Sequence, residues 1–182
     1  MENQRERAKE ILKQLTLQEK IDMIHGSQLF QTKGVERLGI PPLKMSDGPM
    51  GVRQEFLTAQ WKAVGLNDDY VTYLPCNSAL ASTWNRKQAL EIGSVLGEEA
   101  RGRGKDVILG PGINIKRSPL CGRNFEYFSE DPYLTGEMAA AYIQGVQLWD
   151  VAACVKHFAV NNQETQRLWV EVEIDEQSLR EI

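Results

Sequence analysis

The sequence predicts an α/β protein in which mostly parallel strands alternate with helices. Short apolar runs at residues 43–46, 106–109 and 151–155 have the length of buried strands. Long helical patterns at residues 86–101 and 133–148 separate these runs. Parallel strands require long crossover connections and carry helices on their faces, so this alternation favours a parallel sheet.

Two short helices are expected to open the chain. Apolar side chains recur at helical spacing within residues 5–15. Thr16 and Glu19 form a capping-box pattern, which starts a second helix that carries Ile21 and Ile24. This N-terminal segment therefore precedes the first predicted strand of the sheet.

The first predicted strand ends at a turn signal. Asp47 is followed by Gly48, a residue pair typical of turns, so Asp47 lies at the carboxyl end of the strand at 43–46. Residues 54–75 lack periodicity, which predicts a long surface loop. Residues 79–83 are interpreted as another short strand.

Capping residues define the two longer helices. Asn85 is the predicted N-cap of the helix at 86–101, and glycines at 102–104 end it. The segment from Ser129 to Pro132 has the pattern of an N-terminal cap for the next helix, so Glu130 and Asp131 are not counted as catalytic carboxylates.

The C-terminal segment is expected to add one strand and one helix. Residues 170–174 alternate apolar and acidic side chains, which predicts a half-exposed, antiparallel strand. Asp175 then begins a helix.

Composition excludes several classes of partner. The 182 residues have a formal net charge of −4, with both signs mixed along the chain, whereas a nucleic-acid partner requires a basic patch. No apolar run approaches the roughly 20 residues of a membrane span, so no membrane partner is expected. The cysteines Cys76, Cys121 and Cys154 are odd in number and lack metal-ligand spacing. We therefore expect buried free thiols, a reducing cytoplasmic location, and neither metal nor cofactor.

Polar residues that follow the predicted strands form a candidate binding site, which comprises Asp47, Arg53, Arg123, Lys156 and His157. The carboxyl ends of parallel strands meet at one face, so these side chains are expected to converge there. One carboxylate among several fixed cations suits a polyhydroxylated ligand, whose hydroxyls both donate and accept hydrogen bonds.

Neighbouring residues and local sequence qualify this prediction. Lys156 and His157 are adjacent, so both reach one ligand only if the backbone is irregular, through a bulge or a non-proline cis peptide. Taken alone, Asp47 also fits a turn-capping role. Arg123 also fits an ion pair with Glu126, Glu130 or Asp131.

Three segments resemble the N-terminal domain of glycoside hydrolase family 3 β-glucosidases. They are SDGPMGVR at 46–53, GPGINIKRSPLCGRNFEYFSEDP at 110–132 and KHFAVNNQETQR at 156–167. The resemblance covers essentially the whole chain. It implies that residues 1–182 form the N-terminal portion of a (β/α)8 TIM-type barrel domain, truncated before the strand that bears the nucleophile.

The resemblance also implies roles for the candidate residues. Asp47, Arg53, Arg123, Lys156 and His157 fall on the family positions that hold the hydroxyls of the non-reducing terminal sugar. The family's nucleophile is an aspartate in an SDW-type motif beyond the third segment, and its acid/base glutamate usually lies in a following domain. Neither motif occurs among these residues. No catalytic residue is therefore predicted within the chain, which alone is expected to be inactive.

The implied function is binding of terminal glucose for retaining exo-hydrolysis of β-glucosides or oligosaccharides. Two alternatives stay open: a β-xylosidase or arabinosidase of the same family, and a non-catalytic sugar-binding fragment that requires a complementary chain. A partial barrel leaves sheet edges and apolar surface unpaired, so the expected partner is a polypeptide that carries the rest of the enzyme.

Overall fold

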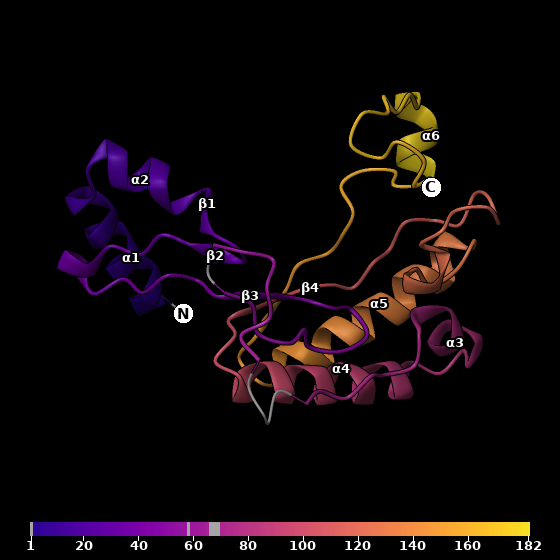
Figure 1. Cartoon of the computed structure of the whole chain (residues 1–182), viewed down its shortest axis with the longest axis horizontal. Coiled ribbons are helices and arrows are strands. Elements are labelled where there is room, and N and C mark those ends of the chain that lie inside the picture. Colours follow the sequence, from indigo (N-terminus) through magenta and orange to yellow (C-terminus); the bar gives the residue numbers. More distant parts are fainter. Residues whose placement is uncertain (1, 58, 66–69) are drawn as a thin grey trace.

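A three-stranded parallel sheet forms the centre of the molecule. The structure is a computed structural model that describes residues 2–57, 59–65 and 70–182. The sheet order is β3 (Met45–Asp47), β4 (Val107–Leu109) and β5 (Ala152–Ala153). Figure 1 labels β3 and β4 near the centre of the molecule. The predicted parallel sheet is confirmed, although β5 has only two residues within the apolar run at 151–155.

Helices form both crossover connections. α3 (Asn77–Ser82) and α4 (Arg86–Gly102) connect β3 to β4, and α5 (Pro132–Gln147) connects β4 to β5. α4 and α5 pack against each other along the same side of the sheet (Figure 1). The predicted caps are confirmed, because the side chains of Asn85 and Asp131 accept hydrogen bonds from backbone N–H groups in the first turns of α4 and α5.

The core lies between this helix pair and the sheet. Its large buried side chains come from both helices, from α3, from β4 and from the segment before α5: Leu80, Leu96, Ile108, Phe128, Met138, Tyr142 and Val146. Successive side chains of a strand point to opposite faces, and in β3 Ser46 is buried whereas Asp47 is half-exposed. Asp47 therefore lies on the sheet face that the helices leave uncovered.

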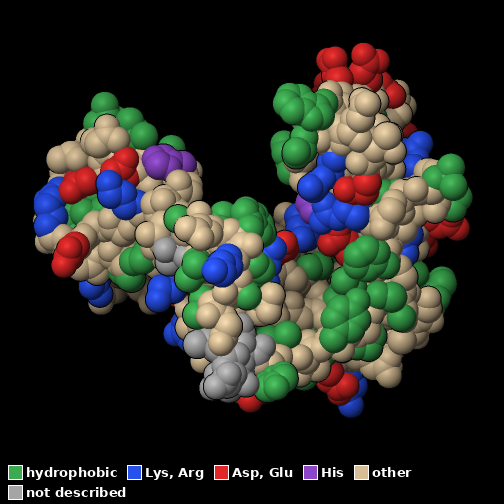
Figure 2. Space-filling model, viewed as in Figure 1, with side chains coloured by type: hydrophobic (Ala, Val, Ile, Leu, Met, Phe, Trp, Pro, Cys, Tyr) green, Lys and Arg blue, Asp and Glu red, His purple; other side chains and the backbone are tan. Residues whose placement is uncertain are grey.

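The terminal segments project to either side of this centre. The helices α1 and α2 lie with a small antiparallel hairpin at one side, and α6 lies at the other, so that an open notch separates them (Figures 1 and 2). The predicted capping box is present, because the Thr16 side chain and the Glu19 carboxylate each accept from the other's backbone N–H. The bounds are α1 (Glu2–Gln14), α2 (Leu17–Met23), β1 (Gly26–Gln28), β2 (Gln31–Thr32) and α6 (Glu176–Glu181), with 3-10 turns at η1 (Glu36–Leu38) and η2 (Asn124–Glu126).

The strand expected at residues 79–83 is wrong, because this segment belongs to helix α3. The buried positions of α3 are Asn77, Leu80 and Ala81, which recur at helical spacing. Alanine and leucine are strong helix formers, and the segment is too short for its apolar composition to distinguish strand from helix.

The strand expected at residues 170–174 is also wrong, because these residues form neither strand nor helix. Val172 and Ile174 are 48% and 37% exposed. A β-strand is stabilised by hydrogen bonds to a neighbouring strand, and alternation in sequence alone does not supply that neighbour. The predicted helix that follows Asp175 is present as α6.

The remaining expectations have mixed outcomes. All three cysteines are free, but only Cys121 is buried, whereas Cys154 is exposed beyond the short strand β5. The described residues of the 54–75 segment contain neither helix nor strand, and residues 58 and 66–69 lie outside the described ranges. None of the described helices combines the length and the apolar character that crossing a bilayer requires.

The contact between α4 and α5 yields a stability prediction. A Cβ at Gly145 of α5 would meet the Leu90 carbonyl oxygen and lie 2.7 Å from the Ser94 nitrogen, both in α4. Gly145→Ala should therefore lower the free energy of unfolding by about 1–3 kcal/mol, as overpacking does. In the same helix, Gly136 has open space around it, so Gly136→Ala should raise stability by about 0.5–1 kcal/mol. Urea unfolding measures both, and equal effects would contradict the close helix contact.

Candidate functional site

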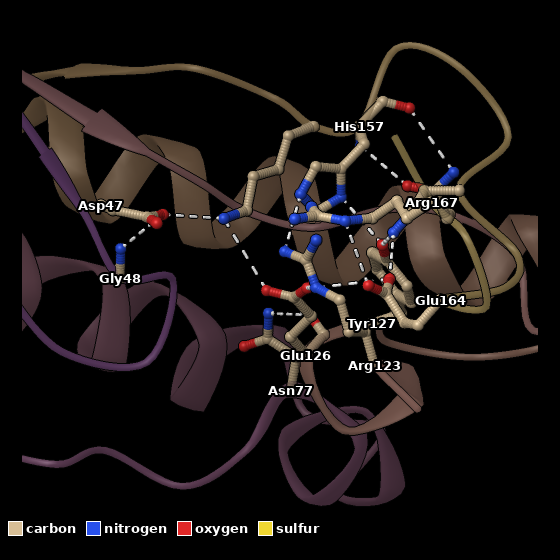
Figure 3. Close-up of polar contacts among 12 residues, drawn as sticks. Asp47, Gly48, Asn77, Arg123, Glu126, Tyr127, His157, Glu164 and Arg167 are labelled. Carbon is tan, nitrogen blue, oxygen red and sulfur yellow. Dashed lines mark hydrogen bonds and ion pairs between the residues drawn. The ribbon is translucent and has the colours of Figure 1, made fainter. Parts of the chain in front are cut away.

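Four of the five predicted site residues lie in one polar network at the open face of the sheet (Figure 3). The Lys156 ammonium donates to Asp47 Oδ1 across 2.9 Å, and Arg123 Nη2 lies 2.9 Å from His157 Nε2. The Lys156–His157 peptide bond is cis, which is one of the two irregularities expected if both side chains face the same site. The structure thus brings Asp47, Arg123, Lys156 and His157 together.

Arg53 lies apart from this network. Its guanidinium carbon is 4.5 Å from the ring centre of Phe30 and 4.7 Å from the ring centres of Phe56 and Trp61. These are cation–π contacts at a separate cavity of about 270 Å³. The charge of Arg53 nevertheless contributes to the electrostatics of Asp47.

Glu126 connects the cations of the site. Its side chain is 5% exposed, and its carboxylate contacts Arg123 Nε and lies 3.7 Å from Lys156 Nζ. Sequence reasoning named Glu126 only as one of three partners for Arg123. The available signal is that the buried aromatic residues Tyr127 and Phe128 directly follow Glu126, since a carboxylate buried beside them requires a paired cation.

The start of helix α3 holds the turn that carries Glu126. The Asn77 side chain donates to the Glu126 carbonyl oxygen across 2.8 Å. The Ser78 hydroxyl lies 3.1 Å from the carbonyl oxygens of both Asn124 and Tyr127. Because the sequence pattern predicts a strand in place of α3, it does not reveal this support for η2.

A second set of residues that the sequence pattern does not reveal surrounds His157. Tyr127 Oη lies 2.8 Å from His157 Nδ1 and 2.8 Å from the Asn161 amide nitrogen. That nitrogen also donates to Glu164 across 2.9 Å. The polar run at 161–164 is evident in the sequence, but its residue types and spacing do not indicate a connection to His157.

The surroundings keep Asp47 ionised. Burial acts to raise the pKa of Asp47, but the hydrogen bond and charge of Lys156, the Gly48 N–H and the charge of Arg53 outweigh it and lower that pKa below its ordinary value. Burial likewise opposes the charge on Arg123, whereas the hydrogen bond and charge of Glu126 raise the Arg123 pKa. The site therefore presents an ionised Asp47 beside a charged Arg123.

The same surroundings keep His157 neutral. Burial, followed by the charges of Arg123 and Lys156, lowers the pKa of His157 from 6.5 to about 4, although Asp47 and Glu164 act in the opposite direction. Burial also raises the pKa of Tyr127 to about 12, so its hydroxyl stays protonated.

A cavity opens beside this network. It has a volume of about 480 Å³, and Lys156 and His157 line it together with apolar side chains such as Ile113, Val155 and Leu179. This volume lies within the range of small-molecule sites, which combine an apolar lining with a few placed polar groups. Lys156 and His157 thus lie at the edge of a largely apolar cavity.

Removing the Glu126 charge should destabilise the chain. Glu126→Gln leaves two partly buried cations with less compensation, so the free energy of unfolding should fall by about 2–4 kcal/mol in urea titrations. Glu130→Gln removes an exposed carboxylate four residues away and should change stability by less than about 0.5 kcal/mol. If both variants matched wild type, Glu126 would not hold the site together.

The lowered pKa of His157 predicts a pH dependence. An unfolded histidine takes up its proton near pH 6.5, whereas folded His157 does so near pH 4. Between these values the unfolded state binds more protons, so stability falls as pH drops from 6.5 to 4. With allowance for solvent screening, the loss is about 1–2 kcal/mol. Urea unfolding of wild type and His157→Gln across this range isolates the effect, and identical pH profiles would contradict it.

Comparisons with known proteins identify relatives of this chain. The sequence model for the N-terminal domain of glycosyl hydrolase family 3 matches residues 11–182. The thermostable beta-glucosidase B of Acetivibrio thermocellus is 51% identical over 174 residues, which cover 96% of this chain and 23% of that protein. An exo-alpha-(1→6)-L-arabinopyranosidase of Bifidobacterium longum is 44% identical over 172 residues, covering 94% of this chain and 23% of that protein.

Solved structures give the same result. The structure of beta-glucosidase 3B from Thermotoga neapolitana in complex with alpha-D-glucose matches with a TM-score of 0.77 and 44% identity, over 87% of this chain and 24% of that one. The chain thus spans about a quarter of the length of these relatives. The family resemblance and the fold expected from it, part of a (β/α)8 barrel, are confirmed. The chain belongs to glycosyl hydrolase family 3, within the N-terminal domain of that family.

Proposed function

We propose that this chain binds the non-reducing terminal glucose of β-glucosides for a retaining, exo-acting β-glucosidase. The observation that carries the proposal is the convergence of the Asp47 carboxylate with the Lys156 and Arg123 cations at the open face of the sheet. In parallel barrels, this end of the strands is where substrates are held. The names of relatives that are beta-glucosidases support the choice of sugar.

The polar groups suit a ligand with neighbouring hydroxyls. An ionised Asp47 accepts hydrogen bonds from two hydroxyls, while Lys156 and Arg123 donate to hydroxyl oxygens. Hydrogen bonds to charged groups are stronger than neutral ones and fix the orientation of the ligand. The cavity beside Lys156 and His157 supplies apolar surface for the less polar face of a sugar ring.

Catalysis requires groups that we assign to other segments of a complete enzyme. Retaining hydrolysis uses a nucleophile and a proton donor about 5 Å apart. The family resemblance locates both outside residues 1–182, so we propose that a complementary polypeptide supplies them. The isolated chain then binds sugar weakly and does not hydrolyse it.

A pentose-releasing activity is the second candidate. The observation that favours it is the 44% identity to an exo-alpha-(1→6)-L-arabinopyranosidase over 94% of this chain. A pentopyranose lacks the hydroxymethyl group at C5, and a pocket distinguishes the presence of one such group by only about 1–3 kcal/mol. Comparing aryl β-glucoside and aryl α-L-arabinopyranoside as substrates separates the two candidates.

An activity assay tests the proposal that this chain binds sugar while another polypeptide supplies the catalytic groups. Release of the aryl group from an aryl β-glucoside should be absent with the chain alone and should appear after mixing with a polypeptide that carries the rest of a family 3 enzyme. The missing nucleophile is the reason for the first result. Turnover by the isolated chain would refute the assignment of catalytic groups elsewhere.

Asp47 should be essential to sugar binding in the complete enzyme. Asp47→Ala removes a charged acceptor from buried hydroxyls, so kcat/KM for a small β-glucoside should fall by a factor that corresponds to about 3–5 kcal/mol of transition-state binding. Glu91→Ala removes an exposed carboxylate of α4 and should leave kcat/KM unchanged. Unchanged kcat/KM in Asp47→Ala would remove Asp47 from the site.

A further inference from the structure

The partners of His157 determine which of its nitrogens carries the hydrogen. Nε2 lies 2.9 Å from Arg123 Nη2, and Nδ1 lies 2.8 Å from Tyr127 Oη. A guanidinium group only donates hydrogen bonds, so Nε2 must accept. A neutral imidazole keeps one N–H, which is therefore on Nδ1 and donates to the Tyr127 hydroxyl oxygen.

The hydrogen bonds of Asn161 and Glu164, at the other end of the network, lead to the same assignment of donors and acceptors. Glu164 Oε1 lies 2.9 Å from the Asn161 amide nitrogen, and an ionised carboxylate only accepts. The same nitrogen lies 2.8 Å from Tyr127 Oη, so its two hydrogens point to Glu164 and to Tyr127. Tyr127 Oη thus accepts from Asn161 on one side and from His157 on the other. Arg123, which only donates, and the Glu164 carboxylate, which accepts, thus fix which groups donate in the hydrogen bonds that connect them through His157, Tyr127 and Asn161.

We propose that Tyr127 and Asn161 are positioning residues that hold His157 as the Nδ1–H tautomer, so that the Nε2 lone pair accepts from Arg123. Without an acceptor at Tyr127, the ring can place its hydrogen on Nε2, where it would face the hydrogens of Arg123. The contact between His157 and Arg123 therefore depends on the uncharged side chains of Tyr127 and Asn161.

The tautomer has a consequence for the ligand, and this step rests on the proposed function. Lys156 and Arg123 only donate hydrogen bonds, whereas Nε2 of the Nδ1–H ring accepts them. The one lone pair of Nε2 is occupied by Arg123, so the tautomer acts on the ligand by orienting the guanidinium, which donates to a sugar hydroxyl.

Nitrogen NMR of the full chain tests the tautomer directly. The chain has two histidines, so two sets of ring signals are expected, and His25→Gln assigns them. In the ¹⁵N-labelled wild type at neutral pH, His157 should show a protonated Nδ1 and an unprotonated Nε2. A ring that is mainly Nε2–H, or doubly protonated, overturns the proposal.

Variants test the positioning role. Tyr127→Phe removes the acceptor for Nδ1–H, and Asn161→Ala frees the tyrosine hydroxyl to donate to the ring. Because Arg123 still disfavours a hydrogen on Nε2, both variants should raise the fraction of the Nε2–H form above that of the wild type without making it the main form. Tyr142→Phe removes another buried hydroxyl, which donates to the Pro49 carbonyl oxygen, and should leave the His157 signals unchanged. If Tyr127→Phe does not fold, Asn161→Ala carries the test. An unchanged tautomer in every folded variant of this pair overturns the proposal.

Glucose addition separates this inference from the proposed function. Binding should shift the Nε2 signal of wild-type His157 while the ring stays neutral. An Nδ1–H ring that does not respond to glucose at any concentration counts against the sugar site and leaves the tautomer assignment intact. A response to glucose from an Nε2–H ring supports the sugar site and overturns the tautomer assignment.

Discussion

The site depends on one buried carboxylate between two cations. Glu126 contacts Arg123, which is three residues away, and Lys156, which is thirty residues away at the end of another strand. Removing a charge from water is costly unless opposite charges and hydrogen bonds compensate it. The burial of Glu126 therefore requires both cations nearby, and Lys156 in turn contacts Asp47 from a third segment. Electrostatic compensation thus links the three segments that the parallel sheet brings to one face.

The fold makes this compensation possible. The crossover helices α4 and α5 occupy one side of the sheet, so side chains that alternate away from the core, such as Asp47, face the open side. The loop after β4 carries Arg123 and Glu126, and its turn is fixed by Asn77 and Ser78 of α3. Packing of the helices and placement of the polar groups are therefore consequences of the same connections.

The sequence predicted the features that depend on local patterns. The sequence predicts the helix caps at Asn85 and Asp131 correctly, because each cap is a short pattern that marks the start of a helix. It likewise predicts the strands before the polar loops. The role of Glu126 and the hydrogen bonds through Tyr127 depend on contacts between distant segments, which spacing does not encode. The strands predicted at 79–83 and 170–174 are wrong for related reasons, because the structure of a short apolar or alternating run depends on the segments that pack beside it. Arg53 was predicted to join the cluster, but three aromatic rings surround it instead.

The most direct test of this account is a double-mutant cycle between Glu126 and Lys156 in the chain itself. Unfolding free energies of Glu126→Gln, Lys156→Met and the double variant give the coupling between the two side chains. Their separation of 3.7 Å and low exposure predict a favourable coupling of about 1–3 kcal/mol. Additive effects, with a coupling within about 0.3 kcal/mol of zero, would contradict the claim that Glu126 joins the segments of the site.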